Sequence, residues 1–148
     1  MARKWLFKSE PNTWSWEQQI AKGEMGEEWD GVRNYHARNF MRVMRVGDLG
    51  FFYHSLSEKS IVGMVEVIKE ASQDSTTNDP RWQCVHIKAI QSIKNPVSLQ
   101  AIKSHPDLTD MVLVKNSRLS VQPVTDFEWH IICQMSDKKN EEHNAPHK

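Results

Sequence analysis

Four arginines stand close together in a segment of the chain that contains no acidic residue. Arg33, Arg38, Arg42 and Arg45 lie within residues 31–47, and that segment holds neither Asp nor Glu. If the segment is helical, the last three occupy positions i, i+4 and i+7 and share one face. A guanidinium donates two parallel hydrogen bonds to a phosphate and is weakly hydrated. The pattern therefore indicates either a stripe that binds phosphates or a solvated helix face whose arginines pair with carboxylates elsewhere.

Trp29 is the aromatic residue whose surroundings least resemble those of a core position. The chain has six tryptophans among 148 residues, and Trp29 stands in the polar run Glu28-Trp29-Asp30-Gly31. Such a ring either plugs the end of a barrel or forms a pocket wall that stacks on a flat ring. The expected core tryptophans are Trp5, Trp82 and Trp129, while Trp14 and Trp16 flank the first helix and hold it against the sheet.

Two short polar runs lie at the ends of predicted strands, at points where side chains leave the core and can meet a ligand. One run is Lys8-Ser9-Glu10-Pro11, and the other is Tyr53-His54-Ser55. Each run is consistent with the mouth of a binding site or with ordinary hydrogen bonding at a turn or strand end.

Catalytic and cofactor motifs are missing from the sequence. It contains no Gly-rich phosphate loop, no Rossmann fingerprint, no HExxH and no GxSxG. Neighbouring residues of a strand point to opposite faces, so His54 and Ser55 cannot form a nucleophile–base pair. Cys84 and Cys133 lie in apolar segments without metal-ligand spacing, and we expect them to be reduced thiols. We therefore predict no catalytic residues, no metal and no cofactor.

Composition limits the classes of partner. The 19 basic and 19 acidic residues give a net charge of zero, which argues against coating nucleic acid or membrane by bulk charge. The mean hydropathy of −0.64 fits a soluble protein. No apolar run approaches the ~20 residues of a membrane span, and the first residues lack the apolar stretch of a signal peptide. We expect a protein that is not secreted and is cytoplasmic, or nuclear in a eukaryote.

Apolar periodicity and turn residues predict the elements that would position these groups. Capping boxes at Ser15/Gln18 and Thr125/Glu128 mark two helix starts, and Gly63 marks a bulge or close approach within a strand. The predicted strands are 5–8, 49–54, 61–68, 82–93 and 119–124. The predicted helices are 16–21, 35–46, 98–104 and 126–135, and residues 108–114 contain either a helical turn or a strand.

This order of elements predicts an α+β fold. Adjacent strands would form a curved sheet or a small β-barrel, with short helices around it. The length predicts a single domain over residues 1–136. Residues 137–148 are charged and lack aromatic and β-branched residues, so we predict a disordered tail there.

Several of these segments, taken in order, resemble the EVE domain of the PUA-like superfamily, which is related to YTH domains. The resemblance spans about residues 3–135, all but the tail. The matching stretches are Trp5–Pro11, Trp29–Tyr35 with Ala37–Asn39, Val46–Asp48 with Phe51–Ser55, Ile61–Gly63, Arg118–Val124 and Glu128-Trp129.

The resemblance implies a pseudo-barrel that binds a modified base, particularly a modified cytosine in DNA or RNA, in an aromatic pocket. Trp29 would stack on the base, and Tyr53, Tyr35 or an apolar residue would form the second wall. The residues that would border the pocket are Lys8, Ser9, Asn34, Tyr53, His54 and Ser55, with the backbone of Ser120, Val121 and Gln122 facing the base edge. The flanking phosphates would meet Arg33, Arg38 and Arg118, together with Arg42 from the arginine stripe.

Our hypothesis from the sequence is a monomeric reader of nucleic acid that is not an enzyme. A second hypothesis is a small amidohydrolase related to the ASCH branch of PUA-like proteins, which act on an acetylated cytidine. In that case Lys8 and Glu10, at alternate positions of a strand, would serve as amine and acid. A third is an adaptor for another protein, which would need an exposed apolar patch.

Overall fold

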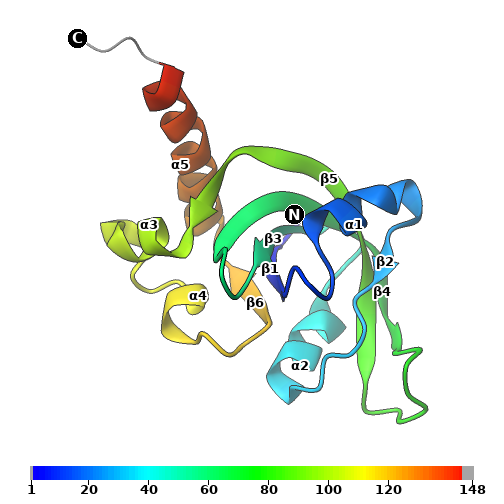
Figure 1. Ribbon diagram of the computed structural model, residues 1–148. Helices are drawn as coiled ribbons and strands as arrows, with labels where there is room; N and C mark the ends of the chain where they lie inside the picture. Colours follow the sequence, from blue (N-terminus) through cyan, green and yellow to red (C-terminus); the bar gives the residue numbers. More distant parts are fainter. Residues whose placement is uncertain (1, 145–148) are drawn as a thin grey trace.

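The computed structural model describes residues 2–144, with side chains described up to residue 137 (Figure 1). The strands are β1 (Lys4–Ser9), β2 (Glu27–Glu28), β3 (Leu49–His54), β4 (Ser60–Gln73), β5 (Gln83–Ser98) and β6 (Val121–Val124). The helices are α1 (Trp16–Ala21), α2 (Tyr35–Val43), α3 (Leu99–Ser104), α4 (Val112–Lys115) and α5 (Asp126–Asn144), with 3-10 turns at Gly23–Met25 and Pro106–Leu108.

One mixed sheet of six strands forms the centre of the fold, in the order β2-β5-β4-β3-β1-β6. Strands β1 and β3 run parallel, and every other neighbouring pair is antiparallel. Register shifts between the long strands β4 and β5 accompany the strong curvature visible in Figure 1. The predicted α+β fold with a curved sheet is confirmed. Within residues 2–144 the edge strands β2 and β6 do not pair, so the predicted barrel is not closed.

Alternate residues of β1 and β3 enter two separate cores because strand side chains point to opposite faces in turn. Phe7 and Phe52 belong to one core, which also contains Trp16 of α1 and Met41 of α2. Their neighbours along the strands belong to the other, which contains residues of α3, α4 and α5. Helices α1 and α2 therefore cover a different face of the sheet from α3, α4 and α5.

Trp16 holds α1 against the sheet, as predicted. Its ring lies 5.1 Å from the Phe52 ring, and its backbone N–H donates to His54 Nε2 at 3.0 Å. A Cβ on Gly63 would lie 2.1 Å from the Trp16 ring, so only glycine leaves room for the indole. The predicted close approach at Gly63 is confirmed, and a register shift between β4 and β5 occurs at the same place.

Helix α2 ends three residues earlier than predicted. The chain becomes extended at Met44, whose side chain is buried in the core. The backbone N–H of Arg45 then donates to the buried carboxylate of Asp48 at 3.0 Å. Burial of Met44 thus overrides the helical periodicity, and Arg45 lies beyond the helix. The predicted arginine stripe is reduced on α2 to Arg38 and Arg42.

Helix α5 continues further than predicted. The Thr125/Glu128 capping box starts it as expected, with hydrogen bonds of 2.9 and 3.1 Å. The helix runs to Asn144, through the first part of the segment predicted to be a disordered tail, and residues 145–148 lie outside the described residues. Lysine and glutamate favour helix once packing has started it, although they bury little apolar surface.

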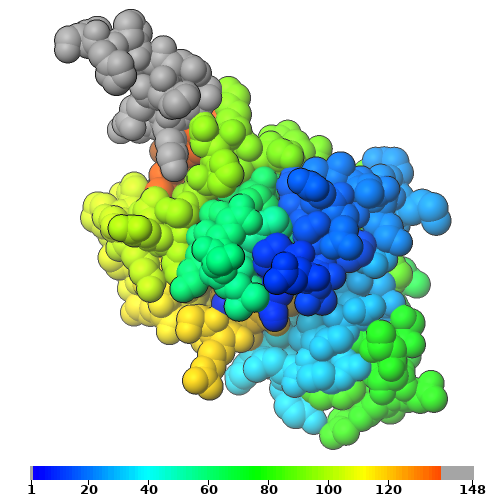
Figure 2. All heavy atoms as spheres, viewed as in Figure 1, coloured from blue at the N-terminus to red at the C-terminus, as the bar shows by residue number. Residues whose placement is uncertain are grey.

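The connection between β4 and β5 lies beside α2. In Figure 1 the hairpin extends beyond the sheet, and in Figure 2 the green atoms of this region adjoin the cyan atoms of α2. Among the helices of residues 2–144, none is both long enough and apolar enough to cross a membrane.

Candidate functional site

A cavity of about 420 Å³ opens where the end of β1 meets the segment between β2 and α2. It brings together five of the residues that the sequence singled out: Lys8, Ser9, Trp29, Arg33 and Ser120. Acidic residues of the same segment also line it, among them Glu28 and Asp30. The cavity therefore presents one large ring together with charged groups of both signs.

Trp29 belongs to the core and also lines the cavity. Its side chain is 8% exposed, and its ring meets Phe7 and Phe52 edge to face, with centroids 5.4 and 5.7 Å away. Its backbone N–H donates to the carbonyl of Val85 at 2.9 Å. These contacts fix the indole before any ligand arrives, which lowers the entropic cost of stacking a second ring on it.

Lys8 contributes a partly desolvated positive charge. Its ammonium donates to the carbonyl of Ser117 and lies 5.9 Å from the centre of the Tyr53 ring. Its backbone N–H donates to the carbonyl of Ser120 at 2.8 Å, which ties the loop before β6 to the cavity. Burial lowers the pKa of Lys8, and no carboxylate among the described residues forms an ion pair with it.

Two carboxylates of the cavity have opposite pKa shifts. Burial, followed by repulsion from Glu28, raises the pKa of Asp30. Burial would also raise the pKa of Glu28, but hydrogen bonds from the hydroxyl and backbone N–H of Ser75 outweigh it and lower that pKa. Asp30 is therefore the carboxyl group of this pair that takes up a proton more readily.

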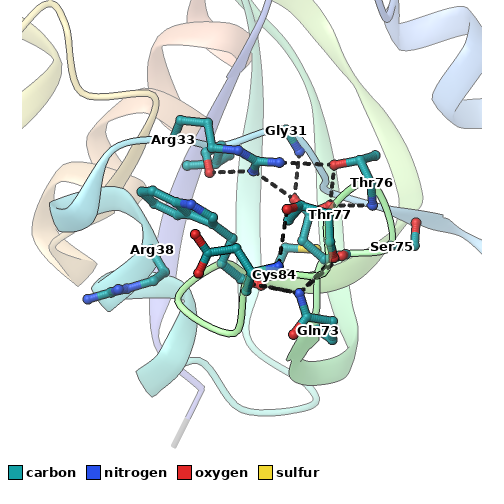
Figure 3. Close-up of polar contacts among 12 residues, drawn as sticks. Gly31, Arg33, Arg38, Gln73, Ser75, Thr76, Thr77 and Cys84 are labelled. Atoms are coloured by element: carbon teal, nitrogen blue, oxygen red, sulfur yellow. Dashed lines mark hydrogen bonds and ion pairs between the residues drawn. The ribbon is translucent and has the colours of Figure 1, made fainter.

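A buried carboxylate on the neighbouring hairpin supports one wall of the cavity (Figure 3). Asp74 Oδ2 accepts hydrogen bonds from Gly31 N at 2.9 Å and from the Arg33 guanidinium at 3.1 Å. Its Oδ1 accepts from the backbone and hydroxyl of Thr76 at 2.8 and 2.5 Å. Burial would raise the pKa of Asp74, but these four donors outweigh it and lower the pKa to about 2. Arg33 thus has a carboxylate partner.

The other residues predicted to border a pocket lie outside the cavity lining. Asn34 caps α2 by accepting a hydrogen bond from the Ala37 N–H at 2.9 Å, and the Ser55 N–H donates to the Ser9 carbonyl at 2.9 Å. His54 accepts from Trp16 and contacts Glu58 at 2.5 Å. The remaining three are buried in the sheet: Tyr53, Val121 and Gln122.

Three of the arginines predicted to hold phosphates have no carboxylate partner among the described residues, and of these Arg42 and Arg118 are exposed while Arg38 is half-buried. Arg38 donates to the Asn39 side chain and to the Arg81 carbonyl at 3.1 Å. Arg42 donates to Gln83 Oε1 at 2.7 Å, and Arg118 is exposed beside β6.

Trp82 does not lie in the core, contrary to the prediction. Strand β5 begins at Gln83, so Trp82 belongs to the connecting loop, where its ring stacks on Tyr35. Trp5 is buried, and Trp129 packs against the second core with its ring 3.8 Å from that of Phe51.

Among the described side chains, no group of three or more His, Cys, Asp or Glu residues could hold a metal ion.

Comparison with known proteins identifies the family. A family model of the EVE domain matches residues 3–135. The chain belongs to the EVE-domain family. Thymocyte nuclear protein 1 of Homo sapiens is 32% identical over 94% of this chain and 76% of its own length.

Solved structures agree with this assignment. A protein of Agrobacterium tumefaciens is 54% identical, with a TM-score of 0.90 over 91% of this chain and 93% of its own. The human THYN1 protein, solved in complex with DNA containing 5-methylcytosine, is 32% identical, with a TM-score of 0.86 over 92% of this chain and 98% of its own. The YTH domain of Zygosaccharomyces rouxii MRB1 shares the fold alone, at 19% identity and a TM-score of 0.56.

The EVE-domain cavity contains residues that the sequence analysis did not single out. Asp30 stands in the polar run around Trp29, and its position beside Trp29 was the available signal. Asp74 lies 43 positions from Gly31 along the chain. No local pattern relates the two.

We expect the substitution Asp74→Asn to lower the free energy of unfolding at pH 7 by about 2 kcal/mol. The pKa of Asp74 falls from an ordinary 3.8 to about 2 on folding, so its contribution is present above pH 4 and is lost as the pH falls towards 2. Urea unfolding of the wild type and of Asp74→Asn at pH 7, 4 and 2.5 measures this difference in the free energy of unfolding.

The wild type should lose more stability than Asp74→Asn between pH 4 and 2.5. Asp110→Asn is the matched control, because Asp110 is exposed and its pair with Lys115 contributes little. Equal acid sensitivity of the wild type and Asp74→Asn would show that the Asp74 network does not stabilise the fold.

Proposed function

We propose that this EVE domain binds nucleic acid by taking one modified base, a modified cytosine, into the cavity beside Trp29. The observation that carries the proposal is the fixed indole in the wall of a cavity of about 420 Å³ that also holds cationic and acidic groups. The complex of the human THYN1 protein with DNA containing 5-methylcytosine supports it, since that relative covers nearly the whole chain.

In this proposal the base leaves its stack and lies against Trp29. Extrusion costs a few kcal/mol, and stacking on an aromatic ring returns ~1–3 kcal/mol. Asp30 is suited to accept a hydrogen bond from an exocyclic amino group such as that of cytosine. Lys8, Ser9 and the Ser120 segment border the same space.

Phosphate contacts supply the remaining affinity. Arg38 is half-buried, Arg42 and Arg118 are exposed, and none of the three is paired with a carboxylate among the described residues, so their guanidiniums are available to phosphate oxygens. Arg33 would lie beside the nucleic-acid strand, and its charge is already balanced by Asp74. Residues of a single chain line the cavity, so the proposed binding as a monomer requires no second copy of the chain.

Selectivity for the modification is modest in this mechanism. Burying one methyl group contributes only ~1 kcal/mol, so the polar edge of the base must be recognised as well. Titration of otherwise identical DNA and RNA oligonucleotides with cytosine or 5-methylcytosine measures the preference for both base and sugar.

We expect Trp29→Leu to weaken binding of the preferred modified oligonucleotide about tenfold, because leucine keeps an apolar side chain in the core but cannot stack on a base. Fluorescence anisotropy with the modified and unmodified oligonucleotides measures the loss. Trp16→Leu is the matched control, since Trp16 is a core tryptophan that packs on the same Phe52 but does not line the cavity. If both variants change the affinity and the preference equally, Trp29 does not contact the base.

Arg38→Gln should weaken binding of all oligonucleotides to a similar degree. Loss of one phosphate contact reduces the slope of log affinity against log salt concentration by about one. Titrations from low to high salt measure that slope, with the exposed Lys103→Gln variant on α3 as a charge-matched control. An unaltered slope would remove Arg38 from the phosphate contacts.

The lowered pKa of Lys8 favours a second candidate, an amidohydrolase acting on an acetylated cytidine. A neutral amine at Lys8 would be the reacting group, and Glu10 lines the same cavity as the acid. Incubation with N4-acetylcytidine, followed by chromatography for cytidine and acetate, tests it. Product that disappears in Lys8→Gln would establish the enzyme, and a flat assay would exclude it for this substrate.

A further inference from the structure

A cluster of aromatic and arginine side chains, which we name the stacking patch, lies between the first turn of α2 and the loop that joins β4 to β5. It consists of Tyr35 and Trp82 with Arg33, Arg38 and Arg81. The two segments meet at the surface in Figure 2, where cyan and green atoms adjoin. Apart from Arg33, none of these residues lines the cavity beside Trp29.

The aromatic rings and guanidinium groups of the stacking patch lie against one another. The rings of Tyr35 and Trp82 are stacked, with centroids 5.0 Å apart and an interplanar angle of 23°. The Arg38 guanidinium lies 4.8 Å from the Tyr35 centroid, and the Arg33 guanidinium lies 5.3 Å from the Trp82 centroid. Aromatic rings and guanidinium planes are the two kinds of surface on which proteins stack unpaired bases.

Burial does not account for these rings. Trp82 belongs to neither hydrophobic core, and Tyr35 is 48% exposed. The Tyr35 hydroxyl accepts a hydrogen bond from Arg81 at 3.1 Å, which keeps its ring in place beside the loop. The structure thus holds two large planar side chains rigidly at the surface, an arrangement suited to a flat ligand.

The stacking patch carries one unbalanced positive charge. Arg33 pairs with Asp74, and Arg81 pairs with Asp79 at 2.5 Å. Arg38 donates only to the neutral side chain of Asn39 and to the Arg81 carbonyl among the described residues. In Figure 3 its guanidinium points away from the polar network around Arg33. An anionic group can therefore reach Arg38 without displacing a carboxylate.

We propose that the exposed Tyr35 ring, held in place by Trp82, stacks the nucleotide next to the base held in the cavity, while Arg38 contacts the phosphate of that nucleotide. The cavity and the stacking patch are adjacent, because Arg33 lines the cavity and also lies over Trp82. In this proposal, the nucleic-acid strand whose modified base enters the cavity passes over the patch. The inference rests on the proposed function, and it adds an unpaired flanking base as a second recognised element.

The test uses the full chain and two sets of oligonucleotides of equal length. In one set the modified cytosine has normal neighbours, and in the other both neighbouring bases are abasic. We expect Trp82→Leu to weaken binding of the first set about tenfold and to leave binding of the second set unchanged. Trp82→Phe, which keeps a flat ring, should recover most of the loss. Phe127→Leu is the control for an exposed aromatic outside the patch, since Phe127 is 61% exposed on α5.

The outcomes separate the two proposals. If Trp82→Leu weakens both sets equally, or neither, the stacking patch does not bind the flanking base, while a preference for modified cytosine that depends on Trp29 keeps the proposed function. If the wild type shows no preference for modified cytosine but Trp82→Leu still weakens the normal set alone, the proposed function fails and the stacking patch stands. A urea midpoint for Trp82→Leu close to that of Phe127→Leu shows that any loss is not unfolding.

Discussion

The buried carboxylate of Asp74 connects two surfaces that the chain makes from distant segments. It accepts hydrogen bonds from Gly31 and Arg33 in the cavity wall and from Thr76 in its own loop. Its backbone N–H donates to the carbonyl of Trp82 at 3.0 Å, which closes the loop that carries the stacking patch. A charge so nearly removed from water is tolerated only because four donors surround it. The compensated carboxylate thereby links the cavity wall to the loop.

The sheet explains why both surfaces lie on the side of α1 and α2. Alternation along β1 and β3 sends Phe7 and Phe52 to that side, and these two rings hold Trp29 by its edges. A second core, with α3, α4 and α5, occupies the other face. After the hydrogen bond from Trp29 to Val85 of β5, the chain leaves the sheet at its unclosed β2 edge, and its residues line the cavity. An aromatic held in this way supplies a preorganised surface for binding.

Local signals predicted the elements whose ends are decided locally. Helix α1 and strand β3 have the predicted bounds, because a capping box starts one and a Gly-Asp turn precedes the other. The prediction for the end of α2 was wrong because the burial of Met44 determines where the helix ends, and burial depends on the whole fold. The two-residue strand β2 has no periodicity to detect. The prediction that Trp82 lies in the core was wrong because apolar character does not reveal whether a residue at a strand boundary faces the core.

The same reasoning explains which site residues the sequence could indicate. The sequence indicated Lys8 and Ser9 by a polar run at a strand end and Trp29 by its polar neighbours. The structure brings these three residues to one cavity. His54 and Ser55 also lie at a strand end, yet His54 accepts a hydrogen bond from Trp16 and the Ser55 N–H donates to Ser9. A strand end predicts that side chains leave the core but not what they meet there. The pairing of Asp74 with Arg33 is a tertiary event with no local pattern.

In the proposed function, the energetics of binding a modified base give the two surfaces different tasks. A methyl group contributes about 1 kcal/mol on burial, whereas taking the base out of its stack costs a few kcal/mol. Contacts to the base alone therefore leave little net affinity, and phosphates and flanking bases must supply it. A chain with no net charge cannot do this by attracting nucleic acid over its whole surface. It can do so with a few arginines near the cavity that we propose to hold the base, whose carboxylate partner among the described residues is absent or, for Arg33, buried.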